Sequence, residues 1–291
     1  MRVSDQSSDA GDAPLSPEEF RRYLDGEVLY GDDFGPSQIE KWYDDERDAY
    51  FRLLGTSESS GPQSYGYHRL NWQYGFQWLP SGRFLNVLGV ESAWGAEFEP
   101  ILNRVDRLTI LEPAGGFARE EIRDVPVTYI EPRPSGEFPF RAGTFDLITC
   151  FGVLHHIPNV SKVVGEMSRC LTRGGYALVR EPTISMGDWR APRPGLTTRE
   201  RRIPLRLLRR IIGVAGLEVI SEKRCMFLLT YNLAPLFHDA VRNSRPALWV
   251  DRLFRSLFAS NLHHHPWNRL QTLRPIAVHH VLRKPQNGSE Q

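Results

Sequence analysis

The sequence predicts an α/β fold in which helices cover both faces of a mainly parallel sheet. Short apolar runs alternate with segments whose apolar residues recur at helical spacing, beginning with the run 84–89. A second run, 108–112, ends in Glu112 one helix-length further on. Such strands pair in parallel, and ligands lie beyond their carboxyl ends. We therefore predict a binding site where these first strands end.

Seven strands are expected in this sheet. After 84–89 and 108–112, the strand-like runs are 125–131, 145–151, 176–180, 217–229 and 276–283. Helices are expected directly after the first strand, near 116–123, at 160–171 and from about Pro204. The glycine in Leu88-Gly89 would let the backbone approach a ligand, and the helix after it would offer free N–H groups to an anion.

The N-terminal part of the chain is expected to be helical. Residues 1–14 are small and polar, and we predict that they are disordered. Two capping boxes follow, Ser16 to Glu19 with Pro17 at the first helical position, and Ser37 to Glu40. Residues 15–81 are therefore predicted to form a helical lid.

The rest of the 291-residue chain reads as one large domain. Its core is expected at residues 82–230 and includes a basic loop at 185–203. Residues 231–291 are expected to add a helical insertion and the final strand to the same domain. The insertion carries an apolar stripe, and we expect this stripe to pack on the core or, in a homo-oligomer, on a partner subunit. Such stripes only occasionally bind to a membrane surface. The stripe consists of Trp249, Val250, Leu253, Phe254, Leu257 and Phe258.

Composition excludes several classes of function. The net charge of +1 gives no overall attraction to nucleic acid or to membranes. No apolar run is long enough to span a bilayer, and the start of the chain lacks the apolar core of a signal peptide. The three cysteines are far apart in apolar segments, which favours reduced, buried thiols. We expect a cytoplasmic protein.

An ordered set of short motifs carries more information than any one of them. In sequence they are Leu88-Gly89, Ile110-Leu111-Glu112-Pro113, Phe138-Pro139-Phe140, Phe145-Asp146, Leu154-His155-His156 and Gly174-Gly175. This order resembles the class I S-adenosylmethionine-dependent methyltransferases, in particular their small-molecule group, over about residues 82–183. The flanking segments look like bacterial methyltransferase-domain proteins associated with surface-polysaccharide genes.

The resemblance implies a Rossmann-like methyltransferase fold with S-adenosyl-L-methionine as its cofactor. It further implies O-methylation of a sugar, a glycan precursor or a related small metabolite. Gly89 would lie against the methionine part, Glu112 would bind the ribose hydroxyls, and Glu131 would lie near the adenine amine. The full set of expected cofactor-binding residues is Gly89, Glu91, Glu112, Pro113, Glu131, Phe140 and Tyr67.

Glu91 departs from the family pattern. The family usually has a second glycine at this place and often a third where Ala93 stands. A glutamate brings a Cβ and a charge to a point where backbone should meet ligand. It could contact the ammonium or sulfonium of the cofactor, or it could obstruct the site. The second outcome would make the protein a catalytically degenerate binding or scaffold protein.

Two histidines are the candidates for catalysis. His155 and His156 follow the fourth strand at its carboxyl end, where the resemblance places the transferred methyl group. An imidazole titrates near neutral pH and could remove a proton from a hydroxyl acceptor, and we favour His156 for this role. The alternative is that both histidines orient the backbone or cap the next helix.

The basic loop is the candidate for acceptor binding. Trp189, Arg190 and Arg193 could bind a phosphorylated or nucleotide-linked acceptor, although a solvated basic face is the simpler interpretation. No metal site is expected. The run His263-His264-His265 has no accompanying carboxylate or cysteine pattern, and its three adjacent histidines cannot easily all ligate one ion.

Overall fold

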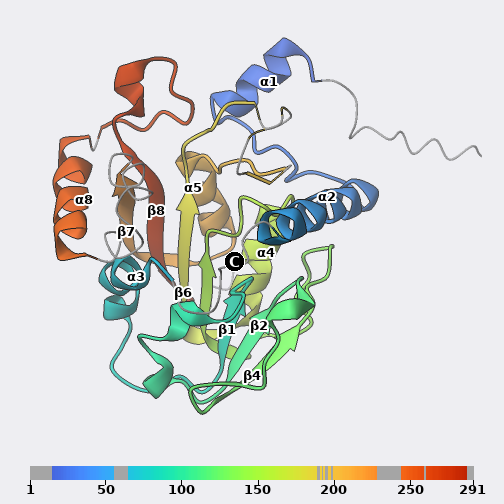
Figure 1. Cartoon of the computed structure of the whole chain (residues 1–291), viewed down its shortest axis with the longest axis vertical. Helices are drawn as coiled ribbons and strands as arrows, with labels where there is room; N and C mark the ends of the chain where they lie inside the picture. The colour runs from blue at the N-terminus through green and yellow to red at the C-terminus, as the bar shows by residue number, and fades with distance from the viewer. Residues whose placement is uncertain are drawn as a thin grey trace, which may run out of the picture.

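The computed structural model describes residues 15–55, 65–188, 191, 193, 196–197, 199–227, 244–258 and 260–286. The predicted disorder of residues 1–14 therefore lies outside the described residues. An eight-stranded sheet runs through the molecule in the order β3-β4-β2-β1-β5-β6-β8-β7 (Figure 1). The strands are β1 (Val87–Val90), β2 (Leu108–Leu111), β3 (Glu121–Ile122), β4 (Val125–Ile130), β5 (Phe145–Phe151), β6 (Leu171–Pro182), β7 (Glu218–Phe227) and β8 (Pro275–Arg283).

The middle of the sheet is parallel, as the alternating pattern predicts. β1 pairs in parallel with β2 and β5, β2 pairs with β4, and β5 pairs with β6. β8 enters antiparallel between β6 and β7, and the two-residue strand β3 adds an antiparallel edge beyond the seven expected strands. The carboxyl ends of β1, β2, β4, β5 and β6 consequently meet at one edge of the sheet.

The helices are distributed over both faces of the sheet. They are α1 (Pro17–Leu24), α2 (Pro36–Gly55), α3 (His68–Tyr74), α4 (Val160–Cys170), α5 (Leu205–Val214) and α8 (Arg245–Leu257). α4 and α5 contact each other behind the strands, whereas α3 and α8 lie against β8 and β7 on the other side (Figure 1). No helix in the described ranges is long and apolar enough to cross a bilayer.

Two apolar clusters fill the space between the layers. Leu88 and Val90 point to the face covered by α4 and α5, while Val87 points to the opposite face and packs near Phe98 and Ile101. This alternation follows from the two-residue period of a strand. β1 is thus buried on both faces, as expected of a central parallel strand.

The helix predicted after the first strand does not form. Residues 91–107 contain only 3₁₀ turns, Ala96–Phe98 and Leu102–Arg104. Glu91, Ala93 and Gly95 have φ values of 49°, 46° and 69°, which interrupt any helix near the strand end. The apolar side chains that suggested a helix, Phe98 and Ile101, are nevertheless fully buried.

The helix predicted near 116–123 is also wrong. A 3₁₀ turn covers Gly115–Phe117, and Glu121–Ile122 then pairs with the start of β4. The connecting residues Arg123 and Asp124 have φ values of 46° and 67°, which is the backbone of a two-residue hairpin turn. An Arg-Asp pair is a poor signal for such a turn, so the sequence did not reveal it.

The N-terminal helices cover the functional edge of the sheet. The capping box of α1 is confirmed, because Ser16 and Glu19 bond each other's backbone N–H groups. α2 begins at Pro36, one residue before the predicted cap Ser37. α2 lies across the sheet edge above β1 and β2 (Figure 1).

The apolar stripe predicted in the C-terminal insertion lies on α8 and just beyond it. Trp249, Leu253 and Leu257 are exposed there. Its packing against a partner subunit stays a prediction.

Candidate functional site

A first cavity of about 450 Å³ lies at the carboxyl ends of the parallel strands. α2 provides one wall, and the segments that follow β1, β2, β4 and β5 provide the others. Its polar lining includes Glu46, Glu91, Glu112, Glu131 and His156. This volume lies within the range of sites for small molecules. The strand-end site predicted from the sequence is therefore a real hollow in the fold.

Glu112 is held at the base of the first cavity by backbone donors. It follows β2, is buried, and accepts hydrogen bonds from the N–H groups of Ala93 at 2.9 Å and Ala114 at 3.2 Å. Burial raises the pKa of its carboxyl to about 7, although both backbone bonds act to lower it. The bond to Ala93 ties the end of β2 to the loop after β1.

Glu91 lies in the same cavity on a backbone that usually needs glycine. Its φ of 49° and the φ of 46° at Ala93 reproduce the left-handed conformation expected of the glycines that the family has there. Burial, and then the neighbouring charge of Glu112, raise the pKa of the Glu91 carboxyl to about 8. The substitution therefore leaves the backbone of the loop in place and adds a protonatable group to the cavity.

The remaining predicted cofactor residues divide between three places. Pro113 and Glu131 line the first cavity with Glu91 and Glu112. Phe140 instead is partly buried and packs against Phe145 of the apolar core, with 4.9 Å between ring centroids. Tyr67 lies in a different cavity, where its ring is 4.2 Å from the guanidinium carbon of a buried arginine.

Gly89 serves the packing of the sheet. It pairs with Ile110 on one side and Thr149 on the other within β1. A Cβ at this position would come within 2.3 Å of the Ser92 hydroxyl oxygen and 3.0 Å of Phe98. Glycine is thus required here by neighbouring side chains of the protein itself.

A second cavity of about 650 Å³ adjoins the first. Phe151, Gly152 and His156 line both cavities, which places the junction at the end of β5. One part of the second cavity is polar, with His155, Arg180, Glu200 and Arg202, and another is apolar, with side chains such as Ile184, Met186, Met226 and Ile276. The fold thus offers two neighbouring binding spaces that meet at a histidine.

His156 is fixed by α2. Its Nδ1 lies 2.8 Å from Glu46 and 3.1 Å from the Thr197 hydroxyl, and its carbonyl accepts a 2.6 Å bond from the indole of Trp42. Burial acts to lower the pKa of His156, but the bond to Glu46 and the charges of Glu200, Glu46 and Glu91 together outweigh it, so the net pKa is raised. Burial acts to raise the pKa of Glu46, but the bond to His156 and its charge, with the bonds from Thr197 and the Arg199 N–H, together lower the net pKa of that carboxyl.

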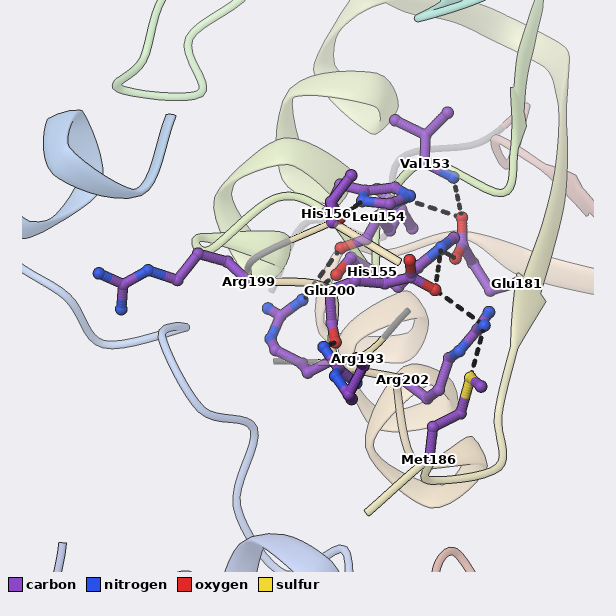
Figure 2. A network of polar contacts seen from close by, with 12 residues as sticks. Val153, Leu154, His155, His156, Glu181, Met186, Arg193, Arg199, Glu200 and Arg202 are labelled. Atoms are coloured by element: carbon purple, nitrogen blue, oxygen red, sulfur yellow. Dashed lines mark hydrogen bonds and ion pairs between the residues drawn. The ribbon is translucent and has the colours of Figure 1, made fainter. Parts of the chain in front are cut away.

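His155 faces two other carboxylates (Figure 2). Its Nδ1 lies 2.9 Å from Glu181, which also accepts bonds from the N–H groups of Val153 and Leu154. Its Nε2 lies 3.6 Å from Glu200, which in turn pairs with Arg202 at 2.8 Å. Burial lowers the pKa of His155 and raises the pKa of Glu181 to about 7, so a neutral imidazole is favoured.

Several residues of this site were not predicted from the sequence. Glu46, Glu181 and Glu200 reach the histidine pair from α2, from β6 and from the segment before α5. Arg180, on β6, is 6% exposed and donates to the Asn71 side chain at 2.6 Å. All four residues are distant from the histidines in sequence. For Arg180 and Glu181, the only signal in the sequence was the presence of charged residues in an otherwise apolar strand.

The predicted acceptor residues are only partly visible. Trp189 and Arg190 lie outside the described residues. Arg193 bonds the carbonyl of Glu200 and lines a separate small pocket near Tyr30 and Met186. Arg202, which the structure does place on the second cavity, is a neighbour of Glu200.

Residues 92–179 match the family model described as a methyltransferase domain. This part of the chain is a class I S-adenosylmethionine-dependent methyltransferase domain. Its cofactor is accordingly S-adenosyl-L-methionine. The matched residues run from the loop after β1 through β6 and contain Glu112 and both histidines.

Solved structures share the fold of this methyltransferase. An S-adenosylmethionine-dependent methyltransferase from Mesorhizobium loti is 14% identical and covers 77% of this chain and 100% of its own, with a TM-score of 0.50. A chain from the complex of the Haloferax volcanii Trm112 methyltransferase activator with a methyltransferase is 12% identical, covering 85% and 98%, with a TM-score of 0.52. A [4+2]-cyclase is 15% identical, covering 89% and 98%, with a TM-score of 0.50. No curated protein sequence matches the chain.

The first cavity fits the cofactor in charge as well as in size. Carboxylates dominate its ionisable lining, and the pKa values of Glu91 and Glu112 are raised by burial. A ligand with a sulfonium and an ammonium group would provide the missing positive charge. Glu112 and Glu131 would hold its hydroxyl and amine groups, and Glu91 is the acid nearest in sequence to the end of β1.

Proposed function

We propose that this methyltransferase methylates an oxygen atom of a small hydroxylated acceptor bound in the second cavity. The observation that carries the proposal is the junction of the two cavities at Gly152 and His156. Methyl transfer is an in-line displacement, so donor and acceptor must bind on opposite sides of one point. A cofactor in the first cavity and an acceptor in the second meet this requirement.

The second cavity supports an acceptor of the sugar or glycan-precursor type. Its polar wall offers histidine, arginine and glutamate side chains that can bind hydroxyl groups, and its methionine and isoleucine side chains can pack against the face of a ring. A volume of about 650 Å³ leaves space for a molecule larger than one sugar ring. A function in surface-polysaccharide synthesis would be one setting for such an acceptor.

His155 and His156 are proposed as the residues that contact the acceptor oxygen. When bound, S-adenosylmethionine supplies a methyl carbon activated by positive sulfur. The acceptor oxygen would receive the methyl group, the electron pair of the broken carbon–sulfur bond would stay on sulfur, and the hydroxyl proton would pass to the imidazole of His156. Glu46 and Glu181 hold the two imidazoles in place for this contact.

The buried cysteines support a reducing compartment. Cys150, Cys170 and Cys225 are all free thiols. We therefore propose that the enzyme acts in the cytoplasm.

Calorimetry with S-adenosylmethionine and S-adenosylhomocysteine tests cofactor binding in the wild type and in Glu112→Ala. We expect both ligands to bind the wild type and to bind the variant at least ten-fold more weakly, because its backbone-anchored carboxylate is lost. Undiminished binding by the variant would remove Glu112 from this role. No binding by the wild type would contradict the proposed function.

Acceptor chemistry is tested by following S-adenosylhomocysteine release in the presence of free sugars, nucleotide-linked sugars and non-sugar alcohols. Release with a hydroxylated acceptor, together with a product one methylene heavier by mass spectrometry, supports the proposal. Cofactor binding without turnover on any acceptor, restored by no substitution at Glu91, would favour the degenerate binding protein instead.

A further inference from the structure

A cluster of potential metal ligands lies in the wall of the second cavity. One ligating atom from each of His155, His156 and Glu200 lies within 4.8 Å of the other two. His155 and Glu200 are buried, and His156 is partly exposed. All three side chains line the second cavity, so an ion held by them would face the space proposed for the acceptor. Two histidines and one carboxylate with an open position are the ligands of catalytic zinc and related sites.

Both histidines are prepared for coordination by a carboxylate behind the ring. Glu181 contacts Nδ1 of His155 at 2.9 Å, and Glu46 contacts Nδ1 of His156 at 2.8 Å. A histidine that ligates a metal through one nitrogen usually donates its other N–H to such a partner, which fixes the tautomer and the ring orientation. In each residue this arrangement leaves Nε2 as the coordinating nitrogen. The pattern occurs twice, at neighbouring residues, with carboxylates from different parts of the chain.

The spacing of the third ligand fits a shared ion. Nε2 of His155 is 3.6 Å from Oε1 of Glu200, which is too long for a hydrogen bond. Two ligands at about 2.1 Å from a tetrahedral ion are separated by about 3.4 Å. Nε2 of His155 has no hydrogen-bond partner among the residues described in the structure. The gap between these two atoms is therefore the one that a bridging ion would occupy.

The surrounding charges are of both signs, because Arg202, Arg201 and Arg180 lie close enough to add to the effect of burial in lowering the pKa of His155, while three carboxylates face the imidazoles. Glu46, Glu181 and Glu200 surround the pair of imidazoles. Arg202 pairs with the same Oε1 of Glu200 at 2.8 Å. Arg202 also contacts the sulfur of Met186 (Figure 2), so it has a second partner if the ion takes a share of Glu200.

We propose that His155, His156 and Glu200 bind one divalent transition-metal ion at the wall of the second cavity. Imidazole nitrogen with a single carboxylate suits zinc, cobalt, nickel, iron and manganese better than magnesium or calcium, which prefer oxygen ligands alone. Binding of the ion itself does not depend on the proposed function. Where that function also holds, the ion takes the place of the direct contact between the imidazoles and the acceptor, and a hydroxyl acceptor at the open coordination position would lose its proton more readily.

The test is metal binding by the full chain, freed of metal with a chelator and carrying no histidine tag, without cofactor or acceptor. Calorimetry with Zn²⁺ is expected to give one ion per chain, and Co²⁺ is expected to give the visible absorption bands of a low-coordinate site. Mg²⁺ is expected to bind at least ten-fold more weakly. Glu200→Gln and His155→Ala should each weaken Zn²⁺ binding at least ten-fold and remove the Co²⁺ bands.

His263→Ala is the matched control, because His263 is exposed and belongs to His263-His264-His265, another run of adjacent histidines. Its Zn²⁺ affinity should equal that of the wild type. Loss of binding in His263→Ala would move the site there and overturn the proposal, as would unchanged binding in Glu200→Gln. If His155→Ala does not fold, the near-isosteric Glu200→Gln decides. Glu181→Gln provides a further readout, with an expected ten-fold or greater loss in affinity.

Discussion

The acid in the loop after β1 makes the stability of the unliganded enzyme depend on pH. Burial and the charge of Glu112 raise the pKa of the Glu91 carboxyl from its ordinary 4.5 to about 8. Between these values the folded protein keeps a proton that the unfolded chain has released. Stability therefore falls as pH rises through this window, by about 1.4 kcal/mol per pH unit.

Glu91→Gln removes this titration while keeping the shape of the side chain. The free energy of unfolding of the variant should rise relative to wild type by about 2 kcal/mol between pH 6 and pH 8, since the slope flattens near the pKa. Urea denaturation of both proteins at pH 6, 7 and 8, followed by circular dichroism, measures the difference. Taking the difference at each pH largely cancels the other carboxyls with raised pKa values, Glu97, Glu112 and Glu181.

Glu91→Gly separates the charge from the backbone. Glycine should show the same change with pH and should add a pH-independent gain of about 1 kcal/mol, because it relieves the left-handed conformation at φ 49°. A gap between wild type and Glu91→Gln that is equal at pH 6 and pH 8 would refute the argument. A Glu91→Gly variant no more stable than Glu91→Gln at pH 6 would refute the strain at this position.

Three further outcomes follow from the packing and charges of the fold. Trp42→Phe should lower kcat/KM about ten-fold, because the indole bond that holds the His156 carbonyl is lost; steady-state kinetics measures this, and an unchanged value would contradict it. Gly95→Ala should lower the free energy of unfolding by about 2 kcal/mol, because φ of Gly95 is 69° and an added Cβ would lie 2.6 Å from the Ile122 side chain. Urea denaturation measures this, and a loss of less than about 0.5 kcal/mol would contradict the clash. The bonds from Arg209, and to a smaller extent the bond from His280, lower the pKa of Glu222 to about 2, although burial acts to raise it. The ionised Glu222 carboxylate therefore stabilises the folded protein by about 2 kcal/mol above pH 4.5, and this stabilisation is lost as the pH falls toward 2. Glu222→Gln should be less stable than wild type at pH 6 and equal to it near pH 2, and a constant gap would argue against this.

The strands were predictable because burial on both faces leaves a simple apolar pattern. Residues 145–151 are an unbroken apolar run apart from Asp146 and Thr149, and they form β5 with the predicted ends. The helix expected after β1 failed for a local reason. Phe98 and Ile101 are spaced as on a helix, but 3₁₀ turns bury the same side chains with fewer residues.

The candidate site was predictable where a residue follows a strand directly. Glu91, Glu112 and Glu131 stand at strand ends, and the parallel sheet brings all three to one cavity. Glu46 and Glu200 could not be assigned in this way, because their partners are set by how α2 and the segment before α5 fold back over the sheet. Phe140 matched a family motif, yet its ring packs in the core, since a motif fixes position along the chain and leaves side-chain direction open.

The histidine turn joins parts of the chain that are distant in sequence. Trp42 and Glu46 of α2 hold His156, and the buried Arg201 donates to the carbonyls of Tyr30, Leu154, His155 and Pro158. Arg199 pairs with Asp45 of the same helix. Any displacement of α2 that widens the first cavity breaks contacts that also shape the second. Binding of one ligand and affinity for the other are then thermodynamically linked, so each substrate changes the affinity of the enzyme for the other by the same factor.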